Sequence, residues 1–412
     1  MKLLTALREE AIKRLEKIEE VDIFVGVPSF NNEGTIQHVV ETTGKGLAKY
    51  YKGARCLIMV SDGGSTDDTR EMAMETEVPP YIEKLVTIYR GMPGKGSAVR
   101  AIFEAAHFLK AKTIILCDAD VKSLTPNWMR NLAEPIIEKH FDYVAPFYVR
   151  YKYDATITNT IAYTLTRALY GKRIRQPIGG DFSFSPRLVS HYISEDVWDT
   201  DIAKFGIDIW LTITAIVGGF RLAQTRLGAK LHDVKDPAEH LGPMFREVVG
   251  TLFYLMGRHK EFWKRVKNSE PVKILGEEIP TKPAPFQVDQ ESLYEHFVAG
   301  LRIYGPLWKA LLSPHDYAIL EKLAQRSPEN FEFPIELWVR IVYDFAIMYH
   351  QWTLPKKRLL DLMIPLYNAR VAALFNVARD MNEEEFEEYI EQNARIFEEN
   401  KSYLIERWEK LQ

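Results

Sequence analysis

Two carboxylates stand two positions apart in Asp118-Ala119-Asp120, directly after the apolar run at 113–117 (TIILC). A buried strand that ends there would present both side chains at the edge of a sheet, within reach of one ligand. Hard carboxylate oxygens suit Mg²⁺ or Mn²⁺, and such a cation can bridge a diphosphate. The alternative is that one aspartate only caps the next helix. The metal-binding interpretation therefore depends on the other motifs found in the sequence.

A second acidic motif at 62–68 (DGGSTDD) follows the apolar run at 56–60. Its glycines allow a tight turn, and Ser65 or Thr66 can cap the helix that follows. A turn with a capped helix does not account for Asp62. We therefore expect Asp62 to accept hydrogen bonds from the edge of a nucleotide base.

The segment at 28–33 (PSFNNE) also follows an apolar run. The main chain of Pro28–Phe30 can line a nucleotide slot, and Glu33 can accept ribose hydroxyls. The alternative for Glu33 is an acid in the first turn of a helix, where the helix dipole favours it.

Gly94-Lys95-Gly96-Ser97 opens a helical pattern, and both helix N-termini and lysines attract phosphate. The spacing is not that of a P-loop. The sequence therefore predicts that Lys95 binds donor phosphate, with a solvated lysine as the alternative.

Three later motifs carry weaker signals. Ile178-Gly179-Gly180 offers backbone amides to a small anion or to sugar hydroxyls, or is simply a hairpin turn. Asp208 begins a helix, either as a ligand contact or as a helix cap. His232 follows a polar strand, and a lone histidine is more often structural than a metal ligand.

Short apolar runs alternate with helical patterns over the first part of the chain. Such runs are typical of a mostly parallel sheet with helices on both faces, in which ligands bind beyond the carboxyl ends of the strands. We therefore predict an α/β fold of the Rossmann-like type. The expected strands are 21–27, 56–60, 84–89, 113–117 and 143–147, and the expected helices are 35–51, 66–76, 95–110, 155–170 and 206–217.

The sequence predicts three regions. Residues 1–20 form an amphipathic helix, residues 21–240 the sheet domain, and residues 241–412 an aromatic-rich helical region. We expect the last region to hold subunits of a homo-oligomer together, or to close over the site, without doing chemistry.

Composition excludes several classes of protein. Of the 412 residues 46% are hydrophobic, which argues against a disordered chain. The net charge of -4 argues against a protein whose overall positive charge binds nucleic acid. Cys56 and Cys117 lie in apolar runs and are expected to be reduced core thiols of a cytoplasmic protein. The longest apolar stretch, at 207–220, contains Asp208 and is too short to span a membrane.

Taken together, PSFNNEG, SDGGSTDDT, GKG and DAD resemble the nucleotide-diphospho-sugar glycosyltransferases of the GT-A fold. QPIGGDF, FGIDIW and LGAKLHD are similar to motifs of the retaining enzymes that make glycosylglycerates, the mannosylglycerate synthases and glucosyl-3-phosphoglycerate synthases. The resemblance covers about residues 21–240 and implies a role for each matching position. Asp120 and His232 would be ligands of Mg²⁺ or Mn²⁺ with Asp118 assisting; Pro28, Phe30, Glu33, Asp62 and Lys95 would hold the nucleotide; Asp208 would contact the sugar or the acceptor; and Ile178, Gly179 and Gly180 would contact glycerate.

The acceptor motif separates the two branches of this family. The phosphoglycerate enzymes carry a Gly-Arg-Val-Thr segment that is absent from FYVRYKYDATITNTIAYTLTR. Arg150 and Thr158 instead fit the spacing of the Arg and Thr that hold the carboxylate of free glycerate in mannosylglycerate synthase. Five basic residues nearby could still form a different site for the acceptor phosphate. The alternative is that they belong to a solvated basic surface. They are Lys152, Arg167, Lys172, Arg173 and Arg175.

The resulting hypothesis is a metal-dependent, retaining transfer of glucose or mannose from a UDP- or GDP-linked donor to the 2-hydroxyl of D-glycerate. No residue is an unmistakable nucleophile, so we favour attack on the same face as the leaving group. The alternative acceptor is 3-phosphoglycerate, and the alternative class is a non-catalytic nucleotide-sugar-binding protein. A nucleotidyltransferase is disfavoured because residues 21–36 lack a Gly-rich loop with Arg and Lys.

Overall fold

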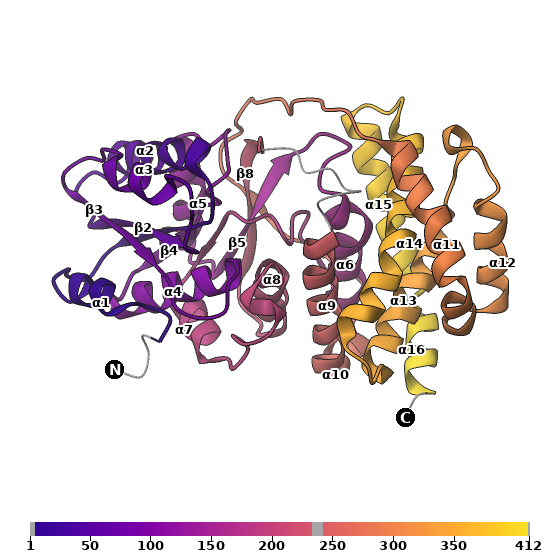
Figure 1. Cartoon of the computed structure of the whole chain (residues 1–412). Coiled ribbons are helices and arrows are strands. Elements are labelled where there is room, and N and C mark those ends of the chain that lie inside the picture. Colours follow the sequence, from indigo (N-terminus) through magenta and orange to yellow (C-terminus); the bar gives the residue numbers. More distant parts are fainter. Residues whose placement is uncertain (1–4, 233–241, 411–412) are drawn as a thin grey trace. The chain divides into compact units, whose positions relative to one another are not determined.

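The structure, a computed structural model, describes residues 5–232 and 242–410. The chain divides into two compact units (Figure 1). We call them the sheet unit, formed by 1–149, 175–233 and 272–284, and the helical unit, formed by 150–174, 234–271 and 285–412.

The sheet unit contains an eight-stranded sheet within its described residues, with the order β10-β8-β5-β7-β4-β1-β2-β3. Only β7 runs antiparallel to its neighbours β4 and β5, so the predicted mostly parallel sheet is confirmed. The strands are β1 (Ile23–Ser29), β2 (Cys56–Asp62), β3 (Ile82–Ile88), β4 (Thr113–Leu116), β5 (Tyr143–Val149), β7 (Phe182–Phe184), β8 (Leu222–Ala229) and β10 (Ile274–Leu275).

Helices cover both faces of this sheet (Figure 1). One face carries α2 (Glu33–Tyr50), α3 (Thr69–Glu75) and α5 (Asn127–Ile137), and the other carries α4 (Lys95–Phe108), α7 (Pro186–Ser194) and α8 (Ile207–Val217). The short helix α1 (Glu9–Leu15) precedes the first strand.

Every residue of β1 and β2 is buried, as expected for strands covered on both sides. The packing of α4 on β1 depends on Gly26, because a Cβ atom there would lie 2.3 Å from Cγ2 of Ile102. Cys56 and Cys117 are free and buried, as the sequence predicts.

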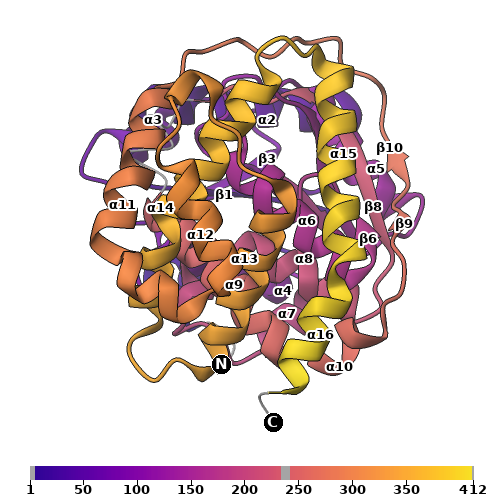
Figure 2. The same ribbon diagram turned by 90° about the vertical axis from the view of Figure 1, so that its right-hand side faces the viewer.

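The first helix of the helical unit is a short π-helix, η1 (Thr158–Ala162), which continues into α6 (Tyr163–Tyr170). Figure 2 labels α6 together with other helices of this unit. Two-residue strands β6 (Lys172–Arg173) and β9 (Glu270–Pro271) pair beside it. The remaining helices are α9 (Gly242–Arg258), α10 (Lys260–Arg265), α11 (Gln290–Leu311), α12 (Pro314–Leu323), α13 (Ile335–Gln351), α14 (Lys356–Ala378), α15 (Glu383–Glu399) and α16 (Lys401–Glu409).

The two units differ from the division predicted from the sequence in two segments. Residues 150–174 belong to the helical unit, because Tyr163 of α6 packs with Leu374 of α14 and Ile390 of α15. Residues 272–284 belong to the sheet unit, because β10 pairs with β8.

Of the expected N-terminal helix at 1–20, residues 1–4 lie outside the described residues, and within 5–20 helix α1 covers Glu9–Leu15. Residues Thr5–Leu7 run beside α4, where the backbone N–H of Ala6 donates to Oε2 of Glu104 at 2.8 Å. Over the described residues, we find no helix that combines the length and the apolar character needed to cross a membrane.

Candidate active site

The predicted motifs meet at the carboxyl edge of the parallel strands. β1 pairs with β2 on one side and with β4 on the other, and Ser29 at the end of β1 lies opposite Asp62 at the end of β2. The Asp118–Asp120 motif follows β4 directly. Parallel strands share the direction of their ends, so the register itself brings these loops together.

Lys95 lies between two acids from distant parts of the chain. Its Nζ atom is 2.8 Å from Oδ1 of Asp118 and 3.0 Å from Oδ2 of Asp208. Lys95 is the first residue of α4 and Asp208 lies in the first turn of α8. The predicted phosphate-binding lysine and the predicted sugar-contacting acid are thus in contact.

Two glycines allow this contact. A Cβ atom on Gly96 would lie 1.9 Å from the carbonyl oxygen of Ile202, and one on Gly94 would lie 2.6 Å from that of Ala203. The N-terminus of α4 can therefore pack directly on the short 3-10 helix at Asp201–Ala203, which leads into α8. This packing determines where Lys95 meets Asp208.

A second lysine, which the sequence analysis did not single out, completes the cluster. Nζ of Lys230 lies 2.7 Å from Oδ2 of Asp118, 2.7 Å from Oδ2 of Asp181 and 2.8 Å from the carbonyl oxygen of Gly179. Asp181 in turn accepts a hydrogen bond from the backbone N–H of Asp118 at 2.8 Å and another from the hydroxyl of Tyr148. Lys230 lies in the motif LGAKLHD, which was the available signal.

The pKa values of the cluster reflect burial opposed by these contacts. Burial disfavours the charged form of Lys95, but the carboxylates of Asp118 and Asp208 outweigh it and raise the pKa of the lysine. Burial also opposes the charge on Asp118, yet Lys230 and Lys95 lower the pKa of that carboxyl. For Asp208 and Asp181 burial dominates and raises the pKa. Asp118 is therefore held as an anion by two ammonium groups.

The two lysines differ in their remaining hydrogen-bonding capacity. An ammonium group has three donors and no acceptor. Lys230 uses its donors on Asp118, Asp181 and Gly179, whereas Lys95 uses two, on Asp118 and Asp208. Lys95 therefore keeps one N–H for a ligand. The other oxygen of Asp208, Oδ1, is buried and has no hydrogen-bond partner among the described residues, so it too can receive a ligand hydroxyl.

Asp120 and His232 are the predicted metal ligands. Asp120 is partly exposed, and its carboxylate forms no hydrogen bond or ion pair with the described part of the chain. The two segments lie side by side, because the N–H of Lys122 donates to the carbonyl oxygen of Leu231 at 2.8 Å and the N–H of Leu231 donates to Oγ of Ser123 at 2.9 Å.

This arrangement fits an open site for a divalent cation. Within the described residues, no three or more His, Cys, Asp or Glu side chains are grouped to hold a metal. Mg²⁺ is commonly bound through one or two carboxylates together with substrate phosphates, without a closed protein cage. An accessible Asp120 beside the segment that carries His232 satisfies that pattern. Asp118 does not, since each of its oxygens already contacts a lysine.

The geometry places Asp62 within its own turn, and its contact with a base stays a prediction. This carboxylate is fully buried and accepts hydrogen bonds from the N–H groups of Gly64 and Ser65 and from the hydroxyls of Ser29 and Ser65, at 2.6–2.9 Å. An ionised carboxylate has about four lone-pair sites, and all are filled. Asp62 orders the turn after β2, and a base contact would require that turn to rearrange.

The other residues predicted to bind the nucleotide-sugar donor differ in their burial and contacts. Pro28 is buried within β1, and Phe30, just beyond the strand, is 59% exposed. Glu33 accepts a hydrogen bond from the N–H of Asp68 at 3.2 Å, which places it against the turn that leads into α3. The exposed ring of Phe30 is an accessible aromatic surface at the edge of the site, and its contact with the donor stays a prediction.

Ile178, Gly179 and Gly180 lie in the loop before β7. Gly180 has a φ of +88°, and a Cβ atom there would lie 1.9 Å from Oδ2 of Asp118. The glycine is required by the approach of Asp118. The contact of this loop with glycerate stays a prediction.

The predicted acceptor residues Arg150 and Thr158 belong to the helical unit. Nη1 of Arg150 forms an ion pair with Oδ2 of Asp154 at 2.6 Å. Thr158 is buried at the start of the π-helix η1. Their role in acceptor binding stays a prediction from the sequence.

Two of the basic residues considered for an acceptor phosphate are paired with acids. Arg167 is buried and forms ion pairs with Glu391 and Glu398 of α15. Lys172 of β6 is paired with Glu270 of β9. Each of these cations already has the anion that a phosphate would replace.

Other members of the set contact the main chain or a hydroxyl. Lys152 donates to the backbone carbonyl oxygens of Arg379 and Met381, just after α14. Arg173 donates from Nε to Oγ of Ser269 at 2.9 Å. These contacts reduce the support for a phosphate site built from this set.

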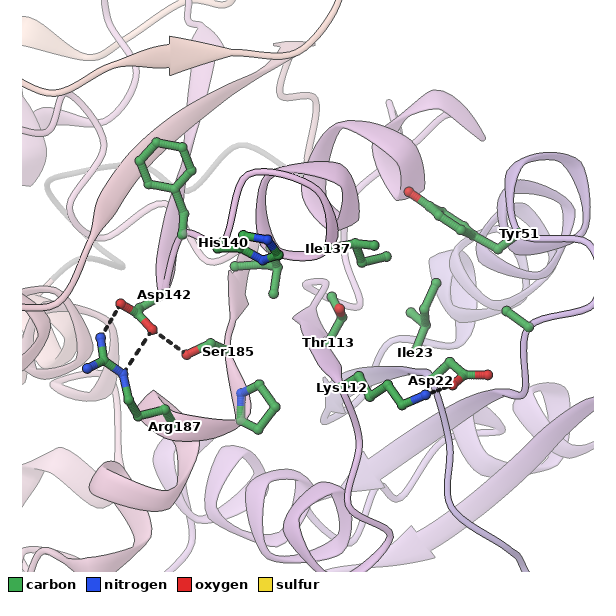
Figure 3. A pocket seen from close by; sticks show the side chains of 14 residues that line it. Asp22, Ile23, Tyr51, Lys112, Thr113, Ile137, His140, Asp142, Ser185 and Arg187 are labelled. Atoms are coloured by element: carbon green, nitrogen blue, oxygen red, sulfur yellow. Dashed lines mark hydrogen bonds and ion pairs between the residues drawn. The ribbon is translucent and has the colours of Figure 1, made fainter.

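A cavity of about 570 Å³ lies at the opposite edge of the sheet (Figure 3). It is lined by residues at the amino ends of β1 and β4 and around the start of β5. Its charged side chains pair with one another, Asp22 with Lys112 at 2.8 Å and Asp142 with Arg187 at 2.5 Å. It shares none of the predicted site residues, and we assign it no role in the reaction.

The fold and this cluster agree with the comparison against known families. Residues 24–198 match the family described as "Glycosyl transferase family 2", which is less than half of the 412 residues. The matched segment contains the motifs from Pro28 to Gly180. The predicted GT-A type of fold and the resemblance to glycosyltransferases are thus confirmed, the family match itself being limited to residues 24–198.

Solved structures of one enzyme, glucosyl-3-phosphoglycerate synthase from Mycobacterium tuberculosis, are similar to this chain. Its complex with Mn²⁺, UDP and glucosyl-3-phosphoglycerate has 26% identity and a TM-score of 0.48, over 57% of this chain and 80% of that chain. Its complex with Mg²⁺ and UDP has 25% identity and a TM-score of 0.48, over 60% and 83%. The cations in those crystals are of the class predicted here. No curated protein matches the chain.

Proposed function

We propose that this protein is a metal-dependent, retaining glycosyltransferase that moves a hexose, glucose or mannose, from a UDP- or GDP-linked donor to the 2-hydroxyl of D-glycerate. The observation that carries the proposal is the position of Lys95. It lies between Asp118 and Asp208 with one unused N–H, and Asp118 opens the motif that also carries the partly exposed Asp120. The ammonium group of Lys95 can bind a diphosphate oxygen directly, and Asp120 can bind it through a divalent cation.

Each residue of the cluster has a distinct part in this proposal. Lys95 donates its remaining N–H to a diphosphate oxygen, where the buried ammonium group stabilises the charge that develops on the leaving group. Asp120 and His232 hold the divalent cation, which supplies further positive charge at the diphosphate when bound. Oδ1 of Asp208 accepts a hydroxyl of the sugar or the acceptor and fixes its orientation.

Retention follows from same-face attack in this proposal. Asp208 has one oxygen bound to Lys95, which weakens it as a nucleophile. The acceptor hydroxyl therefore attacks from the side of the departing diphosphate, whose oxygen takes the proton. Arg150 and Thr158 bind the acceptor carboxylate, and Ile178, Gly179 and Gly180 bind its remaining oxygens.

Free D-glycerate is the proposed acceptor, and 3-phosphoglycerate is the second candidate. The acid-paired state of Arg167 and Lys172, together with the absence of a Gly-Arg-Val-Thr segment, favours the unphosphorylated acceptor. The buried free cysteines support a reducing, cytoplasmic location, and we include a homo-oligomer in the proposal.

A donor-by-acceptor matrix tests this function. UDP- and GDP-linked glucose and mannose are each incubated with D-glycerate or 3-phosphoglycerate in Mg²⁺ or Mn²⁺, and the product anomer is read by NMR. We expect an α-linked glycosylglycerate from one donor with free glycerate. Donor binding in calorimetry with no turnover in any arm would support a non-catalytic nucleotide-sugar-binding protein instead.

A further inference from the structure

The segment Thr5–Leu7, which we call the N-terminal arm, is bonded to two parts of the sheet unit that meet at the start of α4. The backbone N–H of Ala6 donates to Oε2 of Glu104 in α4 at 2.8 Å. The backbone carbonyl oxygen of Ala6 accepts a hydrogen bond from the N–H of Arg90, also at 2.8 Å. One buried residue of the arm therefore holds both α4 and the loop at 90–94, which enters α4.

Glu104 binds the N-terminal arm through both of its oxygens. Its Oε1 atom accepts hydrogen bonds from the hydroxyl of Thr5 at 3.1 Å and from Nε of Arg100 at 2.9 Å. Nη2 of Arg100 donates to the same hydroxyl at 2.7 Å. The side chain of Glu104 is 4% exposed, and burial raises its pKa, so the charged form depends on these donors. A displaced arm would leave a buried carboxylate with fewer partners.

The loop at 90–94 is held at both ends. The arm holds Arg90, and the N–H of Gly94 donates to the hydroxyl oxygen of Tyr89 at 2.8 Å. Tyr89 is the chain neighbour of Arg90, so a displacement of Arg90 reaches Gly94 through this hydrogen bond. Gly94 directly precedes Lys95, the first residue of α4.

Arg100 connects the N-terminal arm to the helix that carries Asp208. Its guanidinium group lies over the ring of Trp198, 5.4 Å from the ring centroid. The ring of Trp198 meets that of Trp210 edge to face, with 5.5 Å between centroids, and Trp210 follows Asp208 by two positions in α8. The arm is thus connected to both helices that bring Lys95 and Asp208 together.

We propose that the N-terminal arm is a positioning element of the donor site, which holds Lys95 in its place between Asp118 and Asp208. This inference rests on the proposed function, in which Lys95 binds the donor diphosphate. Glu104 is the positioning residue through which the arm acts on α4. It follows Lys95 by nine positions, about 13 Å along the helix, and so lies too far away to contact the same phosphate.

Glu104→Ala and Asp142→Ala form a matched pair of variants. Asp142 is also a buried carboxylate that accepts hydrogen bonds from a hydroxyl, a backbone N–H and a guanidinium group, those of Ser185, Arg221 and Arg187. It lies at the opposite edge of the sheet, beside the cavity shown in Figure 3. We expect similar losses of stability, whereas only Glu104→Ala should disturb the donor site.

Calorimetry measures the affinity of each full-length variant for UDP and for GDP in the presence of Mg²⁺. For the nucleotide that the wild type binds, Glu104→Ala should raise Kd about 10-fold, the loss expected for one charge-assisted hydrogen bond, and Asp142→Ala less than about 2-fold. In steady-state kinetics Glu104→Ala should raise the KM for the donor and leave the KM for the acceptor near its wild-type value. Glu104→Gln should recover much of the affinity, because its carbonyl oxygen can still accept from Ala6.

Thr5→Val is a milder variant that keeps the test decisive if Glu104→Ala does not fold. It removes the hydroxyl that bridges Glu104 and Arg100 and should raise the same Kd by a smaller factor. A nucleotide affinity that is unchanged in every folded variant, or that falls equally in Glu104→Ala and Asp142→Ala, would overturn the role of the arm and leave the proposed function standing. Nucleotide binding without turnover of any donor and acceptor would defeat the proposed function alone. A wild-type chain that binds neither nucleotide would overturn both.

Discussion

Nζ of Lys230 lies 2.7 Å from Oδ2 of Asp118, although the two residues are 112 positions apart in the sequence. The side chain of Lys230 is 5% exposed, and the same ammonium group contacts Asp181, whose side chain is fully buried. The first aspartate of the Asp-Ala-Asp motif is thus held in place by a lysine of the segment that follows β8. Its neighbour Asp120 is left accessible to a ligand.

Lys230→Met should destabilise the protein strongly. Removing the ammonium group leaves Asp118 and Asp181 close together with one cation fewer, and breaking a buried pair costs about 3–5 kcal/mol. Equilibrium denaturation measures the loss. Lys112→Met breaks an exposed pair with Asp22 and is the matched control, with an expected change of about 0.5 kcal/mol or less. Similar losses in both variants would show that Lys230 does not stabilise the cluster.

Asp120→Asn and His232→Ala should each remove most of the glycosyltransferase activity, and Asp120→Asn should leave stability nearly unchanged. The carboxylate of Asp120 pairs with no group among the described residues, so its replacement breaks no contact there. Asp118→Asn should instead lower both activity and stability, because Asp118 contacts two lysines. Turnover and unfolding midpoints are measured for all three variants. Undiminished turnover in excess EDTA would falsify the metal assignment.

Gly180→Ala should displace Asp118 and lower activity. The new Cβ atom would lie 1.9 Å from Oδ2 of Asp118, at a residue whose φ is +88°. Gly53 has the same φ of +88° with no atom within 4 Å of a new Cβ, so Gly53→Ala isolates the backbone strain, which is on the order of 1 kcal/mol. We expect Gly180→Ala to cost more stability by at least about another 1 kcal/mol. Equal losses in both variants would contradict the steric argument.

Asp344 should make stability depend on pH. Burial raises the pKa of Asp344 to about 6, from an ordinary value of 3.8, against the opposing charge of Arg407 3.0 Å away. Between these pH values the folded chain binds more protons than the unfolded chain, so this group lowers the free energy of unfolding as pH rises. Over this pH range, Asp344 lowers the free energy of unfolding by about 3 kcal/mol in total.

Asp344→Asn tests this contribution by denaturation at several pH values. The stability of the variant relative to wild type should rise between about pH 4 and pH 6 and then level off. Asp361→Asn removes a more exposed carboxylate, paired with Arg246, and serves as the control. Wild type and Asp344→Asn curves that stay parallel over this range would rule the effect out.

Arg150→Lys should raise the KM for glycerate far more than the KM for the donor. A planar guanidinium matches a carboxylate with two parallel hydrogen bonds, whereas a lysine ammonium does not. A hydrogen bond to a charged group contributes about 1.5–3 kcal/mol, so we expect an increase of about tenfold or more. Steady-state kinetics with each substrate varied in turn measures the two KM values separately. A much higher kcat/KM with 3-phosphoglycerate than with glycerate would defeat the acceptor assignment.

The sequence by itself determined the sheet and the edge at which ligands bind. Apolar runs such as 56–60 and 113–117 lie within or largely within β2 and β4, because strands covered on both faces must be apolar along their whole length. The motifs that follow them had to share an edge, since parallel neighbours end on the same side. Motif resemblance added His232 as a metal ligand to Asp120 and Lys95, which the residue pattern had already indicated.

The tertiary structure decided which of these residues contact one another. It placed Lys95 between Asp118 and Asp208, added Lys230 and Asp181, and filled every acceptor site of Asp62 with hydrogen bonds from its own turn and from Ser29. It also assigned 150–174 to the helical unit. Local periodicity reports which residues are buried, but the charge partner of a buried group can lie far along the chain, as Lys230 does from Asp118 at 112 positions. Only the packing of the whole chain fixes the approach of such segments.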